Sequence, residues 1–258
     1  MRQRGDVFEI CYNGIELMSN LNHQSEDQLA LRSMRRMNFE ARRVLIGGLG
    51  LGFTLRAVLD LAPPDAEVTV CELIPEIVEW NRGPLAHLAA HALDDPRTRV
   101  LIGDVQAHLA AIDTAYDLIL MDTDNGPESL VREANTELYE DCGLGAVARS
   151  LGPKGVVAFW SATTSLRFER RLSAQPWFWL RDDIPLLPGR VDAMHHIYSC
   201  SFSAAALGQR EAASASRRQT AYVDALSNSR GNQSSRRRWP AIIPWPGNGG
   251  DVRPGRST

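Results

Sequence analysis

Residues 44–54 read V-L-I-G-G-L-G-L-G-F-T, an apolar run that leads into a glycine-rich turn. About two dozen residues later a second apolar run, V-T-V-C-E, closes on Glu72. Glycine lets a backbone come close to a ligand at a strand-to-helix turn, and an acid at the tip of the next strand can accept both ribose hydroxyls. The pattern predicts a nucleoside-binding βαβ unit. Alone, it fits both a dinucleotide fold and a sulfonium-nucleoside transferase.

Composition and charge narrow the class of protein. The 258 residues are 44% hydrophobic and 23% charged, enough for one sizeable core or two small ones. The net charge of -3 divides into about +6 on residues 204–258 and about -9 on residues 1–203. An acidic folded part argues against nucleic acid as its partner. Four widely spaced cysteines predict reduced thiols in a cytoplasmic protein. With no secretory h-region and no apolar stretch near 18 residues, we expect neither export nor a membrane partner.

The first of three expected parts covers residues 1–40. Its start alternates apolar and polar residues around Asn13-Gly14, a strong hairpin signal, with D-V-F-E-I-C-Y and I-E-L-M as the two strands. A helix is expected at 26–38, with Ser25 as its cap.

Residues 41–203 repeat the order strand, helix, strand. The expected strands are V-L-I-G, V-T-V-C-E, R-V-L-I-G-D, Y-D-L-I-L-M-D and G-V-V-A-F-W. Short apolar strands separated by helices indicate a parallel sheet covered on both faces. Residues 179–184 and 195–202 are expected to close it as an antiparallel pair. The predicted fold class is therefore α/β, a doubly wound, mainly parallel sheet with an antiparallel C-terminal strand pair and a small N-terminal β-hairpin.

Residues 204–258 change in composition to Ser, Arg, Gly, Pro and Asn, which predicts a largely disordered basic tail. A solvated tail without function is favoured over contact of Arg236, Arg237, Arg238 and Trp239 with RNA or a membrane surface. A C-terminus read in another frame would look the same.

Four acids follow strands at what would be one edge of the sheet. They are Glu72, Asp104, Asp122 and Asp124. In an open α/β sheet the carboxyl ends of the strands form the ligand-binding edge. Asp104 is placed to accept from an adenine amino group, with the amide beside it against the ring. The competing interpretation of Glu72 or Asp104 is a loop acid that caps the next helix.

The order of these motifs resembles a known family. The stretches that carry the resemblance are V-L-I-G-G-L-G-L-G-F-T-L-R, C-E-L-I-P-E-I-V-E, D-D-P-R-T-R-V-L-I-G-D, Y-D-L-I-L-M-D-T-D-N-G-P, E-L-Y and L-G-P-K-G-V. Together they resemble the class I S-adenosylmethionine-dependent fold and, more narrowly, the spermidine synthase family of aminopropyltransferases. The resemblance covers residues 6–202. It implies a Rossmann-like nucleoside-binding catalytic domain and, as in that family, a homodimer.

The resemblance also implies roles for single residues. Glu72 would bind ribose, Asp104 adenine, and Asp122 would line the junction of donor and acceptor. The predicted cofactor-binding set is Gly47, Gly48, Gly50, Glu72, Gly103 and Asp104. The donor substrate would be S-adenosylmethionine or decarboxylated S-adenosylmethionine, with no metal.

Three departures from the family bear on the acceptor. The family's G-G-G-D-G-G carries an aspartate that pairs with the amine of the aminopropyl group, whereas G-G-L-G-L-G-F-T has no acid and is one residue longer. The family's D-S-x-D-P is D-T-D-N-G-P here, and S-N-L-N-H-Q-S-E stands where the family shows an acid and a Tyr-His-Glu run. A diamine needs carboxylates at both ends of its slot, because an unpaired buried ammonium is costly. This argues against putrescine as the acceptor.

The transfer itself calls for a carboxylate beside the attacking amine, to hold it and take its proton. Asp122 is the first candidate and Asp124 the second, although Asp124 fits an Asx turn almost equally well. His23 and Glu26 are predicted to bind substrate by closing over the site, with a structural role for His23 as the alternative. His195 and His196 are expected in an edge strand, packed or exposed. Trp160 is expected in the core or on a cleft wall.

The leading hypothesis is a transferase that uses an adenosyl-sulfonium donor to alkylate a small-molecule amine. A methyltransferase using intact donor is the alternative, favoured by the missing acid in the glycine turn. A non-catalytic nucleoside-binding module is a third hypothesis, and an NAD-dependent dehydrogenase a distant fourth.

Overall fold

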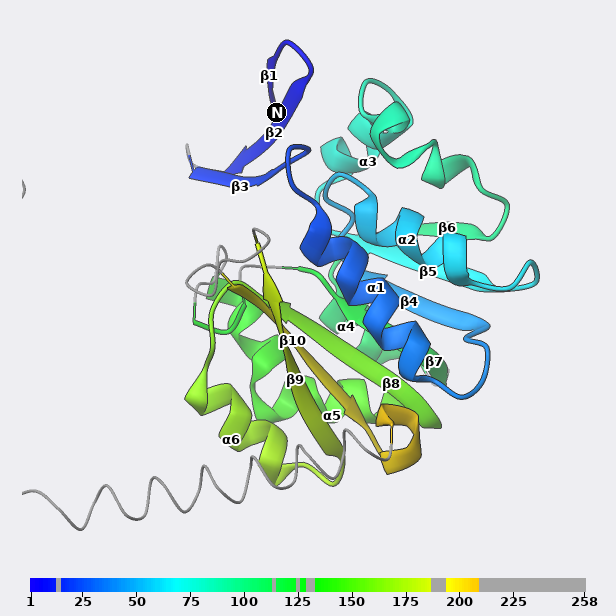
Figure 1. The fold of residues 1–258 in the computed structure, drawn as a ribbon, viewed down its shortest axis with the longest axis vertical. Coiled ribbons are helices and arrows are strands. Elements are labelled where there is room, and N and C mark those ends of the chain that lie inside the picture. The colour runs from blue at the N-terminus through cyan, green and yellow to red at the C-terminus, as the bar shows by residue number, and fades with distance from the viewer. Residues whose placement is uncertain (13–14, 113–114, 124–125, 129–132, 187–193, 209–258) are drawn as a thin grey trace, which may run out of the picture. The chain divides into compact units, whose positions relative to one another are not determined.

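Seven strands form the central sheet of the computed structural model, in the order β6-β5-β4-β7-β8-β10-β9 (Figure 1). The structure describes residues 1–208 apart from 13–14, 113–114, 124–125, 129–132 and 187–193, and all of the described residues belong to one compact unit. The strands are β4 (Arg43–Gly47), β5 (Glu67–Glu72), β6 (Thr98–Ile102), β7 (Tyr116–Met121), β8 (Leu151–Ser161), β9 (Phe178–Pro185) and β10 (Met194–Ser201). The first five run parallel, whereas β10 pairs antiparallel with both β8 and β9. The predicted α/β fold, mainly parallel with an antiparallel closing pair, is confirmed.

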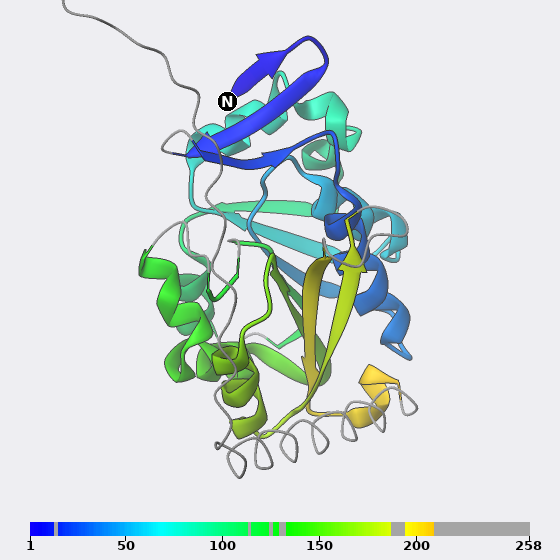
Figure 2. The ribbon, with the colours of Figure 1, turned by 60° about the vertical axis from the view of Figure 1, so that its left-hand side comes forward.

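Six α-helices in the described part of the chain cover the two faces of this sheet (Figure 2). They are α1 (Gln24–Arg36), α2 (Phe53–Leu61), α3 (Pro75–Arg82), α4 (Val105–Ala111), α5 (Asp141–Ser150) and α6 (Leu166–Ala174). Four short 3-10 helices, η1 (Ala86–Ala89), η2 (Ala92–Asp94), η3 (Glu133–Tyr139) and η4 (Ala204–Leu207), connect or follow them. None of the described helices has the length and apolar character needed to cross a membrane.

The alternation of side chains along the strands divides the interior into two cores. In β4, Val44 and Ile46 pack into the core beneath α1, α2 and α3, whereas Leu45 faces the core beneath α4, α5 and α6. All three side chains are fully buried. Successive residues of a strand point to opposite faces, so a strand covered on both sides must be apolar throughout. This is why the parallel strands read as short continuous apolar runs.

A separate three-stranded antiparallel sheet precedes α1. It consists of β1 (Arg2–Arg4), β2 (Val7–Tyr12) and β3 (Ile15–Ser19). The predicted hairpin corresponds to β2 and β3, while its Asn13-Gly14 turn lies outside the described residues. β1 was missed because its three residues are exposed and carry no apolar pattern.

Three local predictions are corrected. Ser25 does not cap the first helix, which begins at Gln24 with His23 in the cap position; the Ser25 hydroxyl instead donates to Glu26 Oε2 at 2.5 Å. β10 is not an edge strand, because β9 pairs along its outer side. The folded part extends beyond residue 203, since Ala206 and Leu207 of η4 are buried. Most of the tail predicted to be disordered, residues 209–258, lies outside the described residues.

The glycine turn after β4 is held between two neighbouring strands. The Gly48 N–H donates to Cys71 O at 2.9 Å, and the Asp122 N–H donates to Gly47 O at 2.8 Å. Gly48 has a φ of 94°, and a Cβ atom on it would meet the carbonyl oxygen of Asp122 at 2.1 Å. Only glycine fits this position, because it accepts positive φ and leaves room for the end of β7.

A Gly48→Ala substitution should therefore destabilise the fold strongly. Left-handed φ and overpacking against main chain together should cost about 3 kcal/mol or more. Gly5→Ala is the matched control, because Gly5 also has positive φ (60°) but no atom within 4 Å of its added Cβ. The free energies of unfolding, measured in urea, should rank wild type above Gly5→Ala and Gly5→Ala well above Gly48→Ala. Equal losses in the two variants would contradict the close contact with Asp122.

Candidate functional site

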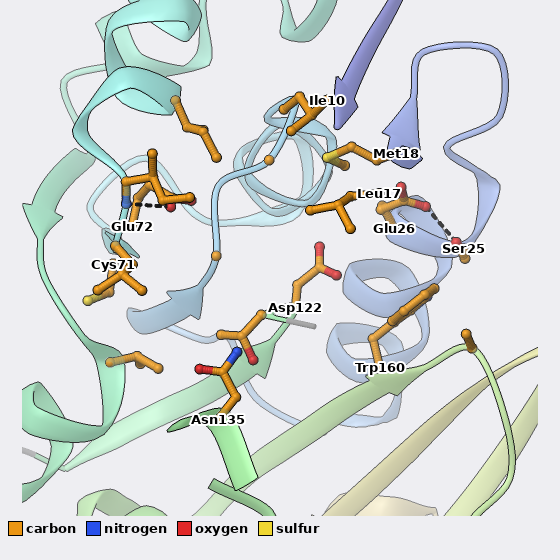
Figure 3. Close-up of a pocket in the computed structure, with 18 of the residues that line it drawn as sticks. Ile10, Leu17, Met18, Ser25, Glu26, Cys71, Glu72, Asp122, Asn135 and Trp160 are labelled. Carbon is orange, nitrogen blue, oxygen red and sulfur yellow. Dashed lines mark hydrogen bonds between the residues drawn. The ribbon is translucent and has the colours of Figure 1, made fainter. Parts of the chain in front are cut away.

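A cavity of about 590 Å³ lies at the carboxyl edge of the sheet (Figure 3). This volume falls within the roughly 300–1,000 Å³ typical of ligand sites. Predicted residues that line it are Glu26, Gly48, Gly50, Glu72, Gly103, Asp104 and Asp122. The glycine turn and the three acids that follow β5, β6 and β7 thus share one cavity, as the parallel strands predicted.

Glu72 is buried at the tip of β5 and fixes the shape of the turn. Its Oε2 accepts from the Leu49 N–H at 2.8 Å, and its Oε1 accepts from the Ile74 N–H at 2.9 Å. The carboxylate is 6% exposed and also lines the cavity. Each carboxylate oxygen can accept a second hydrogen bond. Glu72 can therefore hold the glycine turn and still accept from a ribose.

Asp104 caps a helix and also lines the cavity. Its Oδ1 accepts from the Gln106 N–H at 2.8 Å, which makes Asp104 the N-cap of α4. The residue is also exposed toward the cavity that it lines. The capping interpretation is thus correct, and it leaves the other carboxylate oxygen free of this bond.

Asp122 and Glu26 bring two acids of raised pKa into the same cavity. Burial, and then the charge of Glu26, raises the pKa of Asp122 to about 7, although the hydrogen bond from Thr54 Oγ1 (2.7 Å) opposes this. Burial likewise raises the pKa of Glu26, against the hydrogen bond from Ser25. Figure 3 shows the two side chains entering the cavity from different elements, β7 and α1. Together they form an acidic centre, in which a smaller contribution from the charge of His23 acts against the rise in the pKa of Glu26.

Three predicted residues are not seen to line this cavity. Gly47 is the last residue of β4, with Met121, Val105 and the Thr123 methyl around the position of a Cβ atom. His23 stacks on Phe53 with ring centroids 4.1 Å apart, and its Nδ1 lies 2.8 Å from Asp27. The structural alternative for His23 therefore fits its position better than a substrate contact. The third residue, Asp124, lies outside the described residues.

The cavity wall also contains residues outside the predicted site. Met18 of β3 lies so close to Gly50 that a Cβ atom there would meet its Sδ at 2.6 Å. Trp160, expected in the core or on a cleft wall, lines the cavity at the end of β8. His195 lines it from the start of β10, and its ring meets that of Trp160 edge-to-face at 4.6 Å.

The signal for His195 was topological. An antiparallel strand begins where its parallel neighbour ends, so the first residues of β10 reach the carboxyl edge. Pairing of His196 with Ser161 sets that register. Burial, with a smaller contribution from the charge of His196, lowers the pKa of His195 to about 4. The imidazole of His195 is therefore neutral at physiological pH.

Comparison with known proteins identifies similar sequences. A sequence profile described as the spermine/spermidine synthase domain matches residues 28–173, which is more than half of the chain. The polyamine aminopropyltransferase of Mycobacterium tuberculosis (strain ATCC 25618 / H37Rv) is 32% identical over 143 residues, covering 49% of this chain and 26% of that protein. Polyamine aminopropyltransferase 2 of Streptomyces coelicolor is 35% identical over 140 residues, covering 48% and 24%. The chain thus spans about a quarter of the length of these curated relatives.

Solved structures with a similar fold come from two groups. Spermidine synthase from Thermotoga maritima matches with a TM-score of 0.60 and 20% identity, covering 75% of this chain and 65% of that chain. Human methyltransferase-like protein 13, solved in complex with SAH, matches with a TM-score of 0.51 and 21% identity, covering 70% and 82%. At these identities the likeness shows the fold, which is the one expected from the sequence.

The raised pKa of Asp122 predicts a specific dependence of stability on pH. Between about pH 4 and pH 7 the unfolded chain has released this proton while the folded chain still holds it, so stability falls as pH rises, by up to about 1.4 kcal/mol per pH unit. Asp122→Asn should flatten that decline in urea unfolding curves measured at several pH values. Asp104→Asn, which alters an exposed acid of the same cavity, should leave the slope unchanged. An equally steep decline in Asp122→Asn would show that Asp122 is ionised throughout this range.

Proposed function

The chain belongs to the spermine/spermidine synthase family, and we propose on this basis that its cavity transfers an aminopropyl group from decarboxylated S-adenosylmethionine to an amine. One observation carries the proposal. The glycine turn, Glu72 and Asp104 share a cavity with two further acids, the half-buried Asp122 and the buried Glu26. A nucleoside surface and an anionic centre are what an adenosyl-sulfonium donor and an amine acceptor require.

The strand order supports a particular position for the donor. The glycine turn, Glu72 and Asp104 follow β4, β5 and β6, which are neighbours on one side of the sheet. Adenosine laid across them would extend its sulfonium toward β7 on the other side of β4. Asp122 stands at that strand end, next to the turn. The reacting carbon would then lie where Asp122 and Glu26 meet the cavity.

The charge of this centre favours a decarboxylated donor. Sulfonium and ammonium groups are stabilised by nearby carboxylates, and the effect grows as water is excluded. The carboxylate of an intact donor would be repelled by the same two acids. The glycine turn carries no acid of its own, but Asp122 accepts from Thr54 in the first turn of α2, directly after that turn. Asp122 can therefore supply a carboxylate where the turn lacks one, which weighs against the methyltransferase alternative.

The transfer is a displacement at the carbon next to sulfur. The lone pair of a neutral amine forms a new C–N bond, the C–S bond breaks, and its electron pair stays on sulfur, which becomes a neutral thioether. The amine then carries an extra proton, which a carboxylate can accept. A base with a pKa near the working pH is the most effective, and burial gives Asp122 a pKa of about 7. Glu26 would hold the amine in line with the bond that breaks.

Donor binding tests the first half of the proposal. Calorimetric titration with decarboxylated and intact S-adenosylmethionine should show tighter binding of the decarboxylated form. Asp104→Asn should weaken it by about tenfold, the usual effect of losing one hydrogen bond to a charged group. Asp60→Asn, which alters an exposed acid of α2 that does not line the cavity, is the control. A clear preference for the intact donor would reject aminopropyl transfer in favour of methyl transfer.

Turnover tests the second half. Asp122→Asn should lower kcat by about 10² to 10⁴, the range expected for a lost general base, while decarboxylated donor still binds. Glu26→Gln should instead raise KM for the amine more than it lowers kcat. Release of the thioether nucleoside from labelled donor measures both constants. Full activity in Asp122→Asn would remove Asp122 from the mechanism, and bound donor without turnover of any amine would favour a binding module.

A further inference from the structure

The cavity has two chemically different ends. Its described carboxylates come from α1 and from the ends of β5, β6 and β7. The end formed by β8, β9 and β10 is lined instead by Trp160, Ala162, Leu186 and His195. If adenosine occupies the β4, β5 and β6 side, this second end is the space left for the acceptor.

Trp160 and His195 make this end aromatic and uncharged. Their rings meet edge-to-face at 4.6 Å, and burial keeps the imidazole neutral at physiological pH. Trp160 Nε1 and His195 Nδ1 are buried and have no hydrogen-bond partner among the described residues. Because neither of these two atoms is open to the cavity, the wall offers a ligand mainly the surfaces of the two rings.

The segment between β3 and α1 also lines this end of the cavity. Leu21 and Asn22, which lie between β3 and α1, line it, and the Asn22 side-chain amide donates to Leu186 O at 3.2 Å. This bond joins the segment to the end of β9. The described residues that line this end are therefore apolar or uncharged.

The two acids at the centre can neutralise fewer cationic groups than a decarboxylated donor and a diamine would bring together. Glu26 and Asp122 interact with each other, so they occupy one region. A decarboxylated donor places an ammonium and a sulfonium there, and the attacking amine adds a third cationic group before it loses its proton. A second acceptor ammonium would lie against Trp160 and His195. None of the described residues that line this end is a carboxylate, and burying an ammonium without one is costly.

From this we infer that the acceptor is an amine whose remainder is neutral and packs on the rings of Trp160 and His195. The inference rests on the proposed function and adds the chemical class of the acceptor. The reacting nitrogen lies at Asp122 and Glu26, and the remainder extends across the ends of β8 and β10. Two strand spacings separate β7 from β10, about 10 Å. An acceptor with four or five heavy atoms beyond its reacting nitrogen fits within this distance.

Three amines of equal length test the inference. Pentylamine, 4-aminobutan-1-ol and 1,4-diaminobutane carry a methyl, a hydroxyl and an ammonium at the same position. With decarboxylated donor saturating, kcat/KM for each follows from the rate of thioether nucleoside release. We expect the two neutral-ended amines to exceed the diamine by about tenfold or more, the penalty for an unpaired buried ammonium. A preference for 1,4-diaminobutane would overturn the inference, and so would turnover of none of the three.

A substitution that reverses the order gives a sharper test. His195→Asp adds a carboxylate to the neutral wall and should raise kcat/KM for 1,4-diaminobutane relative to pentylamine by about tenfold. The matched control is His196→Gln, because His196 binds Asp183 at 2.8 Å and does not line the cavity. It should leave the order of the three amines unchanged. An unchanged order in His195→Asp would place the remainder elsewhere and overturn the inference.

Two measurements separate the possible failures. Trp160→Ala should lower kcat/KM for pentylamine by about tenfold through lost apolar contact, and it provides a second variant if His195→Asp does not fold. An unaltered value would likewise overturn the inference. Calorimetric titration with decarboxylated donor measures donor binding independently of the acceptor. Failure to bind donor rejects the proposed function itself, whereas normal donor binding with diamine preference rejects only the acceptor class.

Discussion

Close contact between the glycine turn and the end of β7 is the constraint on which the site depends. Gly48 passes so near the Asp122 carbonyl that no side chain fits between them. On its other side the turn is held by Glu72 through the Leu49 N–H. Strands β4, β5 and β7 therefore meet on one short turn, through main-chain hydrogen bonds and the Glu72 carboxylate. The distances between the turn and the cavity acids follow from these contacts, so a ligand would meet a surface that is already formed.

The anionic centre has an energetic consequence for the fold. Burial raises the pKa values of Asp122 and Glu26, which means that ionising either acid works against the stability of the folded chain near neutral pH. A bound cation would reverse this effect, because it stabilises the charged forms that burial disfavours. Ligand binding and stability are thus coupled through the same two groups. Such a trade of stability for a charged site is common where function requires it.

The sequence allowed the sheet and its acidic edge to be predicted, because both depend on local patterns. β4, β5 and β7 are apolar on both faces, and parallel strands bring the residues after them to one edge. Glu72, Asp104 and Asp122 follow from that rule alone. The prediction that Ser25 caps the helix was wrong because the Ser25 hydroxyl donates to the carboxylate of Glu26. Glu26 is buried, and this burial arises only in the folded protein.

Trp160 was expected in the core or on a cleft wall, but the position of His195 beside it lay beyond sequence reasoning for a similar reason. Its place depends on the register between β8 and β10, which tertiary pairing sets and no local motif announces. The contact of Met18 with Gly50 likewise joins the small N-terminal sheet to the turn across residues far apart in the chain. Local chemistry identified the acids, whereas the neutral surfaces around them required the assembled fold.

The two ends of the cavity are built from different parts of the chain. From β4 the chain moves outward to β5 and β6, then returns to β7 and continues to β8, β9 and β10 on the other side. The cavity lies at this switch point, where neighbouring strands lead away in opposite directions. Residues proposed to bind the donor come from the first half, and the neutral wall comes from the second. Because the two sets come from different strands, changes on β8 or β10 can alter which amine fits while the nucleoside surface keeps its geometry.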